Sequence, residues 1–134
     1  MDIILSLYPK NIKKIESGIK KYEFRRTIFN KEVNYAFVYA CSPIKKIVGY
    51  FKINSIVSGT PEYIWNKCGN YSGSTKESLL QYYKGKNIAF ALEISNYKKL
   101  STPIDPYKII NKFYPPQFFR YLDDGFKTFN LKRN

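Results

Sequence analysis

The segment Gly18–Arg25, GIKKYEFR, is the most informative stretch of this 134-residue chain. Residues 20–28 alternate in character, which predicts a strand with Glu23 and Arg25 on one face and Phe24 on the other. A carboxylate and a guanidinium on one face place hydrogen-bond acceptors beside a planar fork of donors. Such a pair suits a nucleobase edge or a phosphate. The alternative is an ion pair on a solvated sheet face.

The residues before this segment predict a strand followed by a short helix. Residues 3–8 are mostly apolar, and Pro9 is of the kind tolerated at a first helical position. Gly18 should end the helix. Its core face should carry three isoleucines at spacings of three and four: Ile12, Ile15 and Ile19. Its outer side should carry three lysines: Lys10, Lys13 and Lys14.

The residues after it predict more strands and two capped helices. We expect strands at 34–40, 45–57 and 87–97, with Gly49 marking a bulge or a close backbone approach. Residues 60–62 read as a helix cap with a first-turn proline, and Ser74 with Glu77 fits a capping box. A helical tail should start at 105–106. Because strands and helices do not alternate regularly, this order indicates a mixed α+β fold with a small, strongly bent sheet or barrel.

Composition narrows the function. The chain has 23 basic and 10 acidic residues, a net charge of +13, and no histidine. The positive charge favours nucleic acid, an anionic membrane or a small anionic ligand as partner; the alternative is charge that only aids solubility. Without histidine, Ser-His-Asp triads, Cys-His dyads and histidine metal sites are excluded. Two cysteines cannot form a four-ligand zinc site.

The same features predict a single domain over 1–134, with no cofactor and no metal. No stretch is long enough for a secretory signal or a membrane span, so we expect a cytoplasmic protein that does not contact a membrane. The cysteines, Cys41 and Cys68, should be free thiols.

The spacing Gly18-x-Lys20-x-x-Glu23-x-Arg25 resembles the G-x-K-x-x-E-x-R signature of the ASCH domain family, a branch of the PUA-like β-barrels. Residues 39–43 followed by 47–51 are similar to the next two strands of that family. Residues 115–122 resemble the tail of its standalone prokaryotic members. The similarity therefore runs in order over most of the chain.

The resemblance implies a small PUA-like β-barrel of about five or six strands with flanking helices. It also implies a basic cleft over the signature strand, suited to RNA or a nucleotide. One branch of the family hydrolyses N4-acetylcytidine with a Lys, a Thr and a Glu. That Lys matches Lys20, but the Thr falls at Glu23 and the Glu falls near Tyr71, so two of the three groups are missing. Another member is described as a ribonuclease.

We therefore favour an RNA-binding or nucleotide-binding protein, of a regulatory kind, over an enzyme, and predict no protein partner. The predicted ligand-binding residues are Lys20, Lys21, Glu23, Arg25, Arg26, Tyr39, Ser42, Tyr71 and Gln117. The first alternative is a metal-independent hydrolase acting on RNA or an acylated nucleoside, with Lys20 as its catalytic group. The second is a protein-interaction module. For any single residue the simpler roles remain open: an exposed lysine, a core tyrosine or a turn serine.

Overall fold

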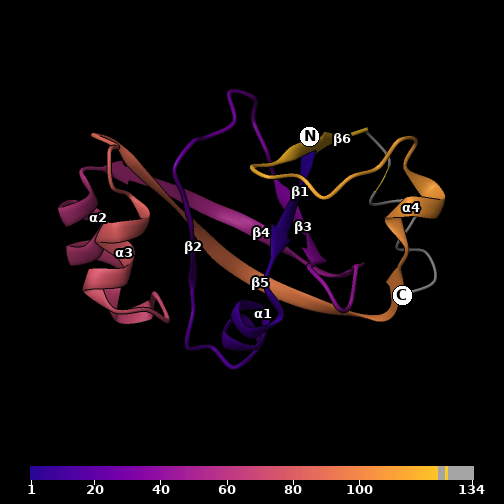
Figure 1. Ribbon diagram of the computed structural model, residues 1–134, viewed down its shortest axis with the longest axis horizontal. Coiled ribbons are helices and arrows are strands. Elements are labelled where there is room, and N and C mark those ends of the chain that lie inside the picture. The colour runs from indigo at the N-terminus through magenta and orange to yellow at the C-terminus, as the bar shows by residue number, and fades with distance from the viewer. Residues whose placement is uncertain (124–125, 127–134) are drawn as a thin grey trace.

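The computed structural model describes residues 1–123 and residue 126. Figure 1 shows two long strands crossing the molecule, with helices at both ends and one helix beside the sheet. The elements in chain order are β1 (Asp2–Leu7), α1 (Pro9–Glu16), β2 (Tyr22–Arg25), β3 (Tyr35–Ala40), β4 (Lys46–Gly59), α2 (Pro61–Cys68), the 3-10 turn η1 (Gly69–Tyr71), α3 (Lys76–Tyr82), β5 (Ala89–Ile104), α4 (Pro106–Ile109) and β6 (Arg120–Leu122).

The six strands form one mixed sheet in the order β2-β5-β4-β3-β1-β6. Strands β1 and β3 are parallel, whereas the other neighbours are antiparallel. The parallel pair requires a crossover, which α1 and β2 provide. The predicted α+β class is therefore confirmed. The pairings leave β2 and β6 as the two ends of the sheet, so its closure into a PUA-like barrel stays a prediction.

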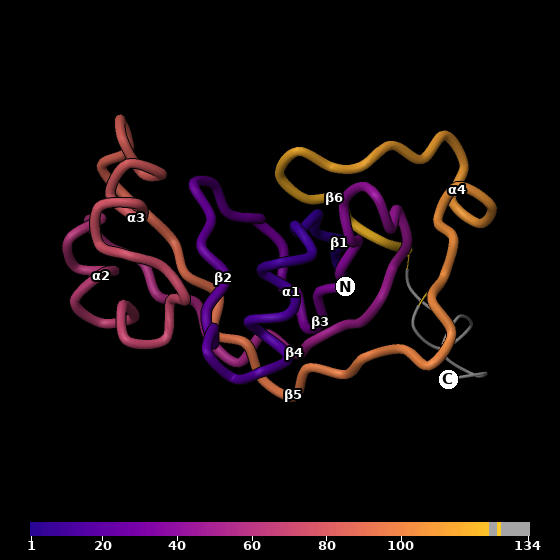
Figure 2. Tube along the Cα trace, turned by 60° about the horizontal axis from the view of Figure 1, so that its bottom comes forward, coloured from indigo at the N-terminus to yellow at the C-terminus, as the bar shows by residue number. Residues whose placement is uncertain are grey.

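Strands β4 and β5 are the longest elements, with 14 and 16 residues. They extend beyond the other strands and carry α2 and α3 at one end, while α4 lies at the opposite end in both views (Figures 1 and 2). Thr60 caps α2, because its side-chain oxygen accepts a hydrogen bond from the backbone N–H of Tyr63 at 3.1 Å. This cap was predicted correctly.

Gly49 lies at an irregularity of β4, as expected. The pairing of β3 with β4 shifts by one residue between Ile47 and Gly49. A Cβ atom at Gly49 would lie 2.6 Å from Cζ of Tyr97 and 2.7 Å from the carbonyl oxygen of Lys98. The strand thus needs glycine here for close approach as well as for the bulge.

Buried side chains form clusters on the two sides of the sheet. The two buried isoleucines of α1, Ile12 and Ile15, pack with Ala36 and Val38 of β3. The alternating β3 residues Phe37 and Tyr39 belong to another cluster, which also contains residues from β1, β4, β5 and β6. A third cluster fixes α2 and α3 against the ends of β2 and β5.

Three local predictions are wrong. Ile19 is 58% exposed, because Gly18 turns the chain at a positive φ of 82° and removes the next residue from the core face of α1. The N-cap of α3 is Thr75, which accepts from the N–H of Ser78 at 3.2 Å, and not Ser74. The tail is helical over α4, but Arg120–Leu122, which were expected to continue the helical tail, form β6 and pair with β1.

The close approach at Gly49 gives the first prediction. Gly49→Ala should lower the free energy of unfolding by about 1–3 kcal/mol, since the new methyl group meets backbone as well as a packed ring. Ser58→Ala is a suitable control, because Ser58 is exposed on the same strand and should change stability by less than about 0.5 kcal/mol. Urea unfolding of both variants measures the difference. Equal stabilities would contradict the packing at Gly49.

Candidate functional site

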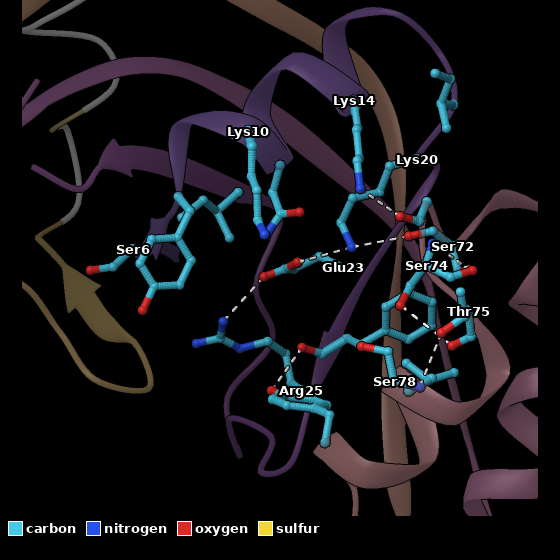
Figure 3. Close-up of a pocket in the computed structure, with 18 residues that line it drawn as sticks. Ser6, Lys10, Lys14, Lys20, Glu23, Arg25, Ser72, Ser74, Thr75 and Ser78 are labelled. Carbon is cyan, nitrogen blue, oxygen red and sulfur yellow. Dashed lines mark hydrogen bonds and ion pairs between the residues drawn. The ribbon is translucent and has the colours of Figure 1, made fainter.

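A cavity of about 760 Å³ lies between α1, β2 and the segment that leads into α3. Figure 3 shows cationic side chains from α1 and β2 facing the serine-rich segment across this space. The polar and charged residues that line it are Ser6, Tyr8, Lys10, Asn11, Lys14, Lys20, Glu23, Arg25, Ser72, Ser74, Thr75, Ser78 and Tyr82. Four of them carry positive charge and only Glu23 carries negative charge, so the cavity suits an anion.

Lys20 is the central residue of the cavity wall. It is only 7% exposed, which is unusual for a lysine. Its Nζ donates to the carbonyl oxygen of Ser72 at 3.4 Å and lies 3.7 Å from Oε1 of Glu23. The same Nζ lies 4.8 Å from the centre of the Phe24 ring. The ammonium group is therefore held by a carbonyl, a carboxylate and an aromatic face.

The turn at Gly18 places this lysine. The N–H of Gly18 donates to Ile15, and the N–H of Lys20 donates to the carbonyl oxygen of Lys14 at 3.0 Å. The chain can reverse here because glycine adopts a positive φ at little cost. As a result, Lys20 enters the cavity from the end of α1 and Glu23 enters it from β2.

Glu23 joins the two cations of the signature. It is 5% exposed, and its Oε2 accepts from Nη1 of Arg25 at 3.2 Å while Oε1 faces Lys20. The second guanidinium nitrogen of Arg25 donates to the carbonyl oxygen of Phe118. Nearby, the hydroxyl of Ser6 donates to the carbonyl oxygen of Pro116 at 2.9 Å. The segment before β6 is thus attached to the cavity wall.

The opposite wall is a tight turn at Ser72 and Gly73. The hydroxyl of Ser72 donates to the carbonyl oxygen of Gly69 at 2.8 Å and accepts from the N–H of Ser74 at 3.1 Å. Gly73 has a φ of 66°, and its carbonyl oxygen accepts from Nζ of Lys14 at 2.7 Å. Two consecutive carbonyl groups therefore hold the ammonium groups of Lys20 and Lys14.

Burial sets the protonation of Lys20. It lowers the pKa of the Lys20 ammonium, because the charged form loses hydration; Glu23 opposes this effect and the like charge of Lys14 adds to it. Burial is thus the main cause of the lowered pKa of Lys20, and Lys14 is the cation that adds to it.

The structure brings Lys20, Glu23 and Arg25 together, as the signature predicts. Lys21 and Tyr71 pair with each other outside the cavity lining, with Nζ of Lys21 lying 4.5 Å from the centre of the Tyr71 ring. Arg26 is exposed and donates to the carbonyl oxygen of Lys84 at 3.2 Å.

The remaining predicted residues lie outside the cavity lining. Tyr39 is 1% exposed, and its hydroxyl group lies 2.9 Å from that of Tyr107, so its ring has no face open to a ligand. The ring is buried because β3 lies between β4 and β1 in the sheet and Tyr39 packs in a core cluster. Ser42 is exposed in the turn after β3. Gln117 is exposed between the two anchored carbonyl groups of Pro116 and Phe118.

Several residues that line the cavity were not predicted from the sequence. Lys10 and Lys14 were assigned to the outer side of α1, but they face the cavity, because the chain returns past α1 after Gly18. Tyr8 and Tyr82 are exposed and line it, which is the position expected of stacking rings. The Ser72–Gly73 pair had a usable signal, since a serine before glycine in a polar stretch favours a tight turn.

In the described part of the chain, no group of three Cys, Asp or Glu residues is arranged to hold a metal ion. Within the same residues, none of the helices has the length and apolar character needed to cross a membrane.

The lowered pKa of Lys20 gives the second prediction. The unfolded chain binds more protons than the folded chain between the folded pKa and 10.5, so the Lys20 contribution to stability increases with pH across that window. Lys20→Met removes this contribution. The stability of the variant relative to the wild type should therefore fall as pH rises toward 10.5.

Urea unfolding at several pH values measures this difference. Lys13→Met is the control for the loss of one positive charge, since Lys13 is exposed on α1. A pH dependence for Lys20→Met no larger than that of the control would contradict the burial of the amine.

No protein-family profile matches this chain. An ASCH domain-containing ribonuclease from Zymomonas mobilis is 28% identical over 124 residues, covering 90% of this chain and 84% of that protein. Two proteins from Ureaplasma parvum strains, described as large ribosomal subunit protein uL22, are 33% identical over 122 residues. This chain spans only 39% of their length.

Solved structures agree with the sequence match. A crystal structure of the Zymomonas mobilis ASCH protein superposes with a TM-score of 0.84 at 28% identity, covering 92% of this chain and 88% of that one. A variant of that protein reaches a TM-score of 0.86 at 27% identity, covering 97% and 95% of the two chains. Together with the signature residues that meet in the cavity, these matches show that the chain belongs to the ASCH domain family.

Proposed function

We propose that this protein binds RNA in the cavity around Lys20 and cleaves it there. The observation that carries the proposal is a buried lysine amine with a lowered pKa in the wall of a cavity that also contains Lys10, Lys14 and Arg25. The similarity to a protein described as a ribonuclease supports cleavage over binding alone.

The arrangement of charges suits a phosphodiester. Arg25 offers a planar guanidinium and Lys14 a second cation, and both types of group bind phosphate oxygens. During RNA cleavage by the neighbouring 2′ hydroxyl, negative charge builds on the phosphoryl oxygens, so fixed cations stabilise the transition state more than the substrate. Glu23 positions Lys20 and Arg25, because each of its oxygens faces one of them. Tyr8 and Tyr82 would stack on bases.

Lys20 is the group that we assign to proton transfer. The 2′ oxygen bonds to phosphorus as the P–O5′ bond breaks. The neutral amine of Lys20 accepts the proton of the 2′ hydroxyl, and the ammonium group so formed gives a proton to the leaving 5′ oxygen. Histidine is absent from the chain. A buried lysine can take part, because its lowered pKa increases the fraction of neutral amine at a given pH.

Replacement of Lys20 separates charge from proton transfer. Lys20→Arg keeps a cation but removes a group that can lose its proton, since arginine stays charged in proteins. The cleavage rate should fall by about 10²- to 10⁴-fold, while the Kd for RNA changes by less than about threefold, which corresponds to under 1 kcal/mol. Lys20→Met removes the cation as well, so it should lower the cleavage rate and raise the Kd for RNA. Gel assays and fluorescence anisotropy with labelled RNA measure the two quantities.

The same assay is run with EDTA and with Mg²⁺, because metal independence stays a prediction. N4-acetylcytidine serves as a second substrate and should not be deacetylated, since Glu23 and Tyr71 stand where that activity needs Thr and Glu. A Lys20→Arg variant that cleaves RNA at the wild-type rate would contradict the assignment of Lys20. A wild-type protein without activity in either buffer would contradict cleavage.

Arg25 tests the phosphate contact. Arg25→Ala should raise the Kd for a 2′-O-methyl RNA about tenfold, or about 1.4 kcal/mol. It should also lower the slope of log K against log salt by about 0.7, the value for one phosphate contact on a single strand. The loss of binding free energy should be larger than the loss of free energy of unfolding. Arg26→Ala is the matched control, because Arg26 is adjacent in sequence and lies outside the cavity lining. If both variants weaken binding equally, Arg25 makes no specific contact.

A further inference from the structure

A second cavity lies on the sheet, away from the first. Its volume is about 470 Å³, and the residues that line it are Tyr35, Tyr50, Lys52, Asn96, Tyr97 and Lys98. None of these residues lines the cavity around Lys20. Its size falls within the range of small-ligand sites.

The aromatic part of the second cavity lies on the opposite face of the sheet from α1. Tyr35 and Phe37 alternate along β3 with Ala36 and Val38, and the latter two pack with α1. Tyr50 pairs with Phe37 across the ladder and therefore shares its face. A ligand in this cavity would be separated by the sheet from α1 and the lysines that it contributes to the first cavity.

Two tyrosines form an aromatic corner with a fixed geometry. The rings of Tyr35 and Tyr50 are 6.0 Å apart and inclined by 65°. Tyr50 stacks on Phe37 at 5.4 Å with an angle of 27°, so its orientation is set by the core below it. Rigid aromatic surfaces of this kind bind planar rings, and base stacking on an aromatic side chain contributes about 1–3 kcal/mol.

Each tyrosine of the corner has a lysine as its neighbour on the next strand. Tyr35 pairs with Lys52 and Tyr50 pairs with Lys98 in the strand register. Both lysines are exposed at the cavity, and none of the described lining residues is acidic. A ligand that presents a planar ring to the tyrosines would thus meet two cations beside it.

The cavity also has polar groups that could read a ligand. Asn96 has a positive φ of 53° and lies where the pairing of β4 with β5 is irregular, which places its amide outside a regular ladder. The hydroxyl of Tyr97 does not contribute, because it packs against Gly49 on the side of the sheet that faces α1.

We propose that this second cavity binds a nucleotide unit, with the base against Tyr35 and Tyr50 and the phosphate between Lys52 and Lys98. The unit is either a free nucleotide or part of an RNA strand. The proposal rests on this cavity alone and does not require that the protein cleaves RNA.

The test is a titration of the isotope-labelled full chain with uridine 5′-monophosphate, followed by NMR. The amide signals of Tyr50, Lys52, Asn96 and Lys98 should shift. Lys52→Ala with Lys98→Ala should raise the Kd for these shifts about fivefold or more, which corresponds to two exposed ion pairs of about 0.5 kcal/mol each. The control is Lys67→Ala with Lys108→Ala, two exposed lysines outside both cavities.

A 2′-O-methyl RNA octamer distinguishes the two sources. If the cavity holds part of a strand, the double variant weakens octamer binding as well; if it holds a free nucleotide, only the monophosphate is affected. The proposal is overturned if these amide signals do not shift, or if the control weakens binding as much as the double variant. Loss of RNA cleavage in Lys20→Arg is measured separately, so the two proposals can fail independently.

Discussion

The burial of one ammonium group is the constraint on which the site depends. A charged lysine removed from water costs several kcal/mol unless it is paired and hydrogen-bonded. Lys20 meets this requirement with the carboxylate of Glu23, the carbonyl oxygen of Ser72 and the ring of Phe24. These partners come from β2 and from the turn before α3, so the buried charge of Lys20 is stabilised only when both walls of the cavity are in place. The net cost of burial remains visible as the lowered pKa of Lys20.

The signature residues can now be given physical roles. Gly18 supplies the positive φ that returns the chain from α1, and Lys20 follows two residues later. Glu23 lies between the two cations and neutralises part of their mutual repulsion. Arg25 reaches from Glu23 to the segment before β6, which links the signature strand to residues about 90 positions later in the chain. The spacing is therefore a consequence of one turn and one strand that together build the cavity wall.

Local rules predicted much of the fold but less of the site. Alternation and capping signals identified the strands and the start of α2, and Gly49 indicated its irregularity in β4. Burial of Tyr39 and exposure of Ile19 were not predictable, because both depend on which strand lies inside the sheet and on the direction of the chain after Gly18. Lys14 donates to the carbonyl oxygen of Gly73, which lies 59 positions later in the chain. A single sequence carries no signal for such a contact. The sequence identified Lys20 as a candidate catalytic group, whereas its burial could be seen only in the structure.

A direct test of this account is the titration of the Lys20 amine by NMR, with and without a bound 2′-O-methyl RNA. The free protein should show a pKa for Lys20 below the ordinary value of 10.5, because the amine is buried. Bound phosphate should raise that pKa, since a nearby negative charge favours the ammonium form. A Lys20 pKa that does not change when RNA is bound, under conditions where binding is saturated, would show that the phosphate lies elsewhere and would contradict the account.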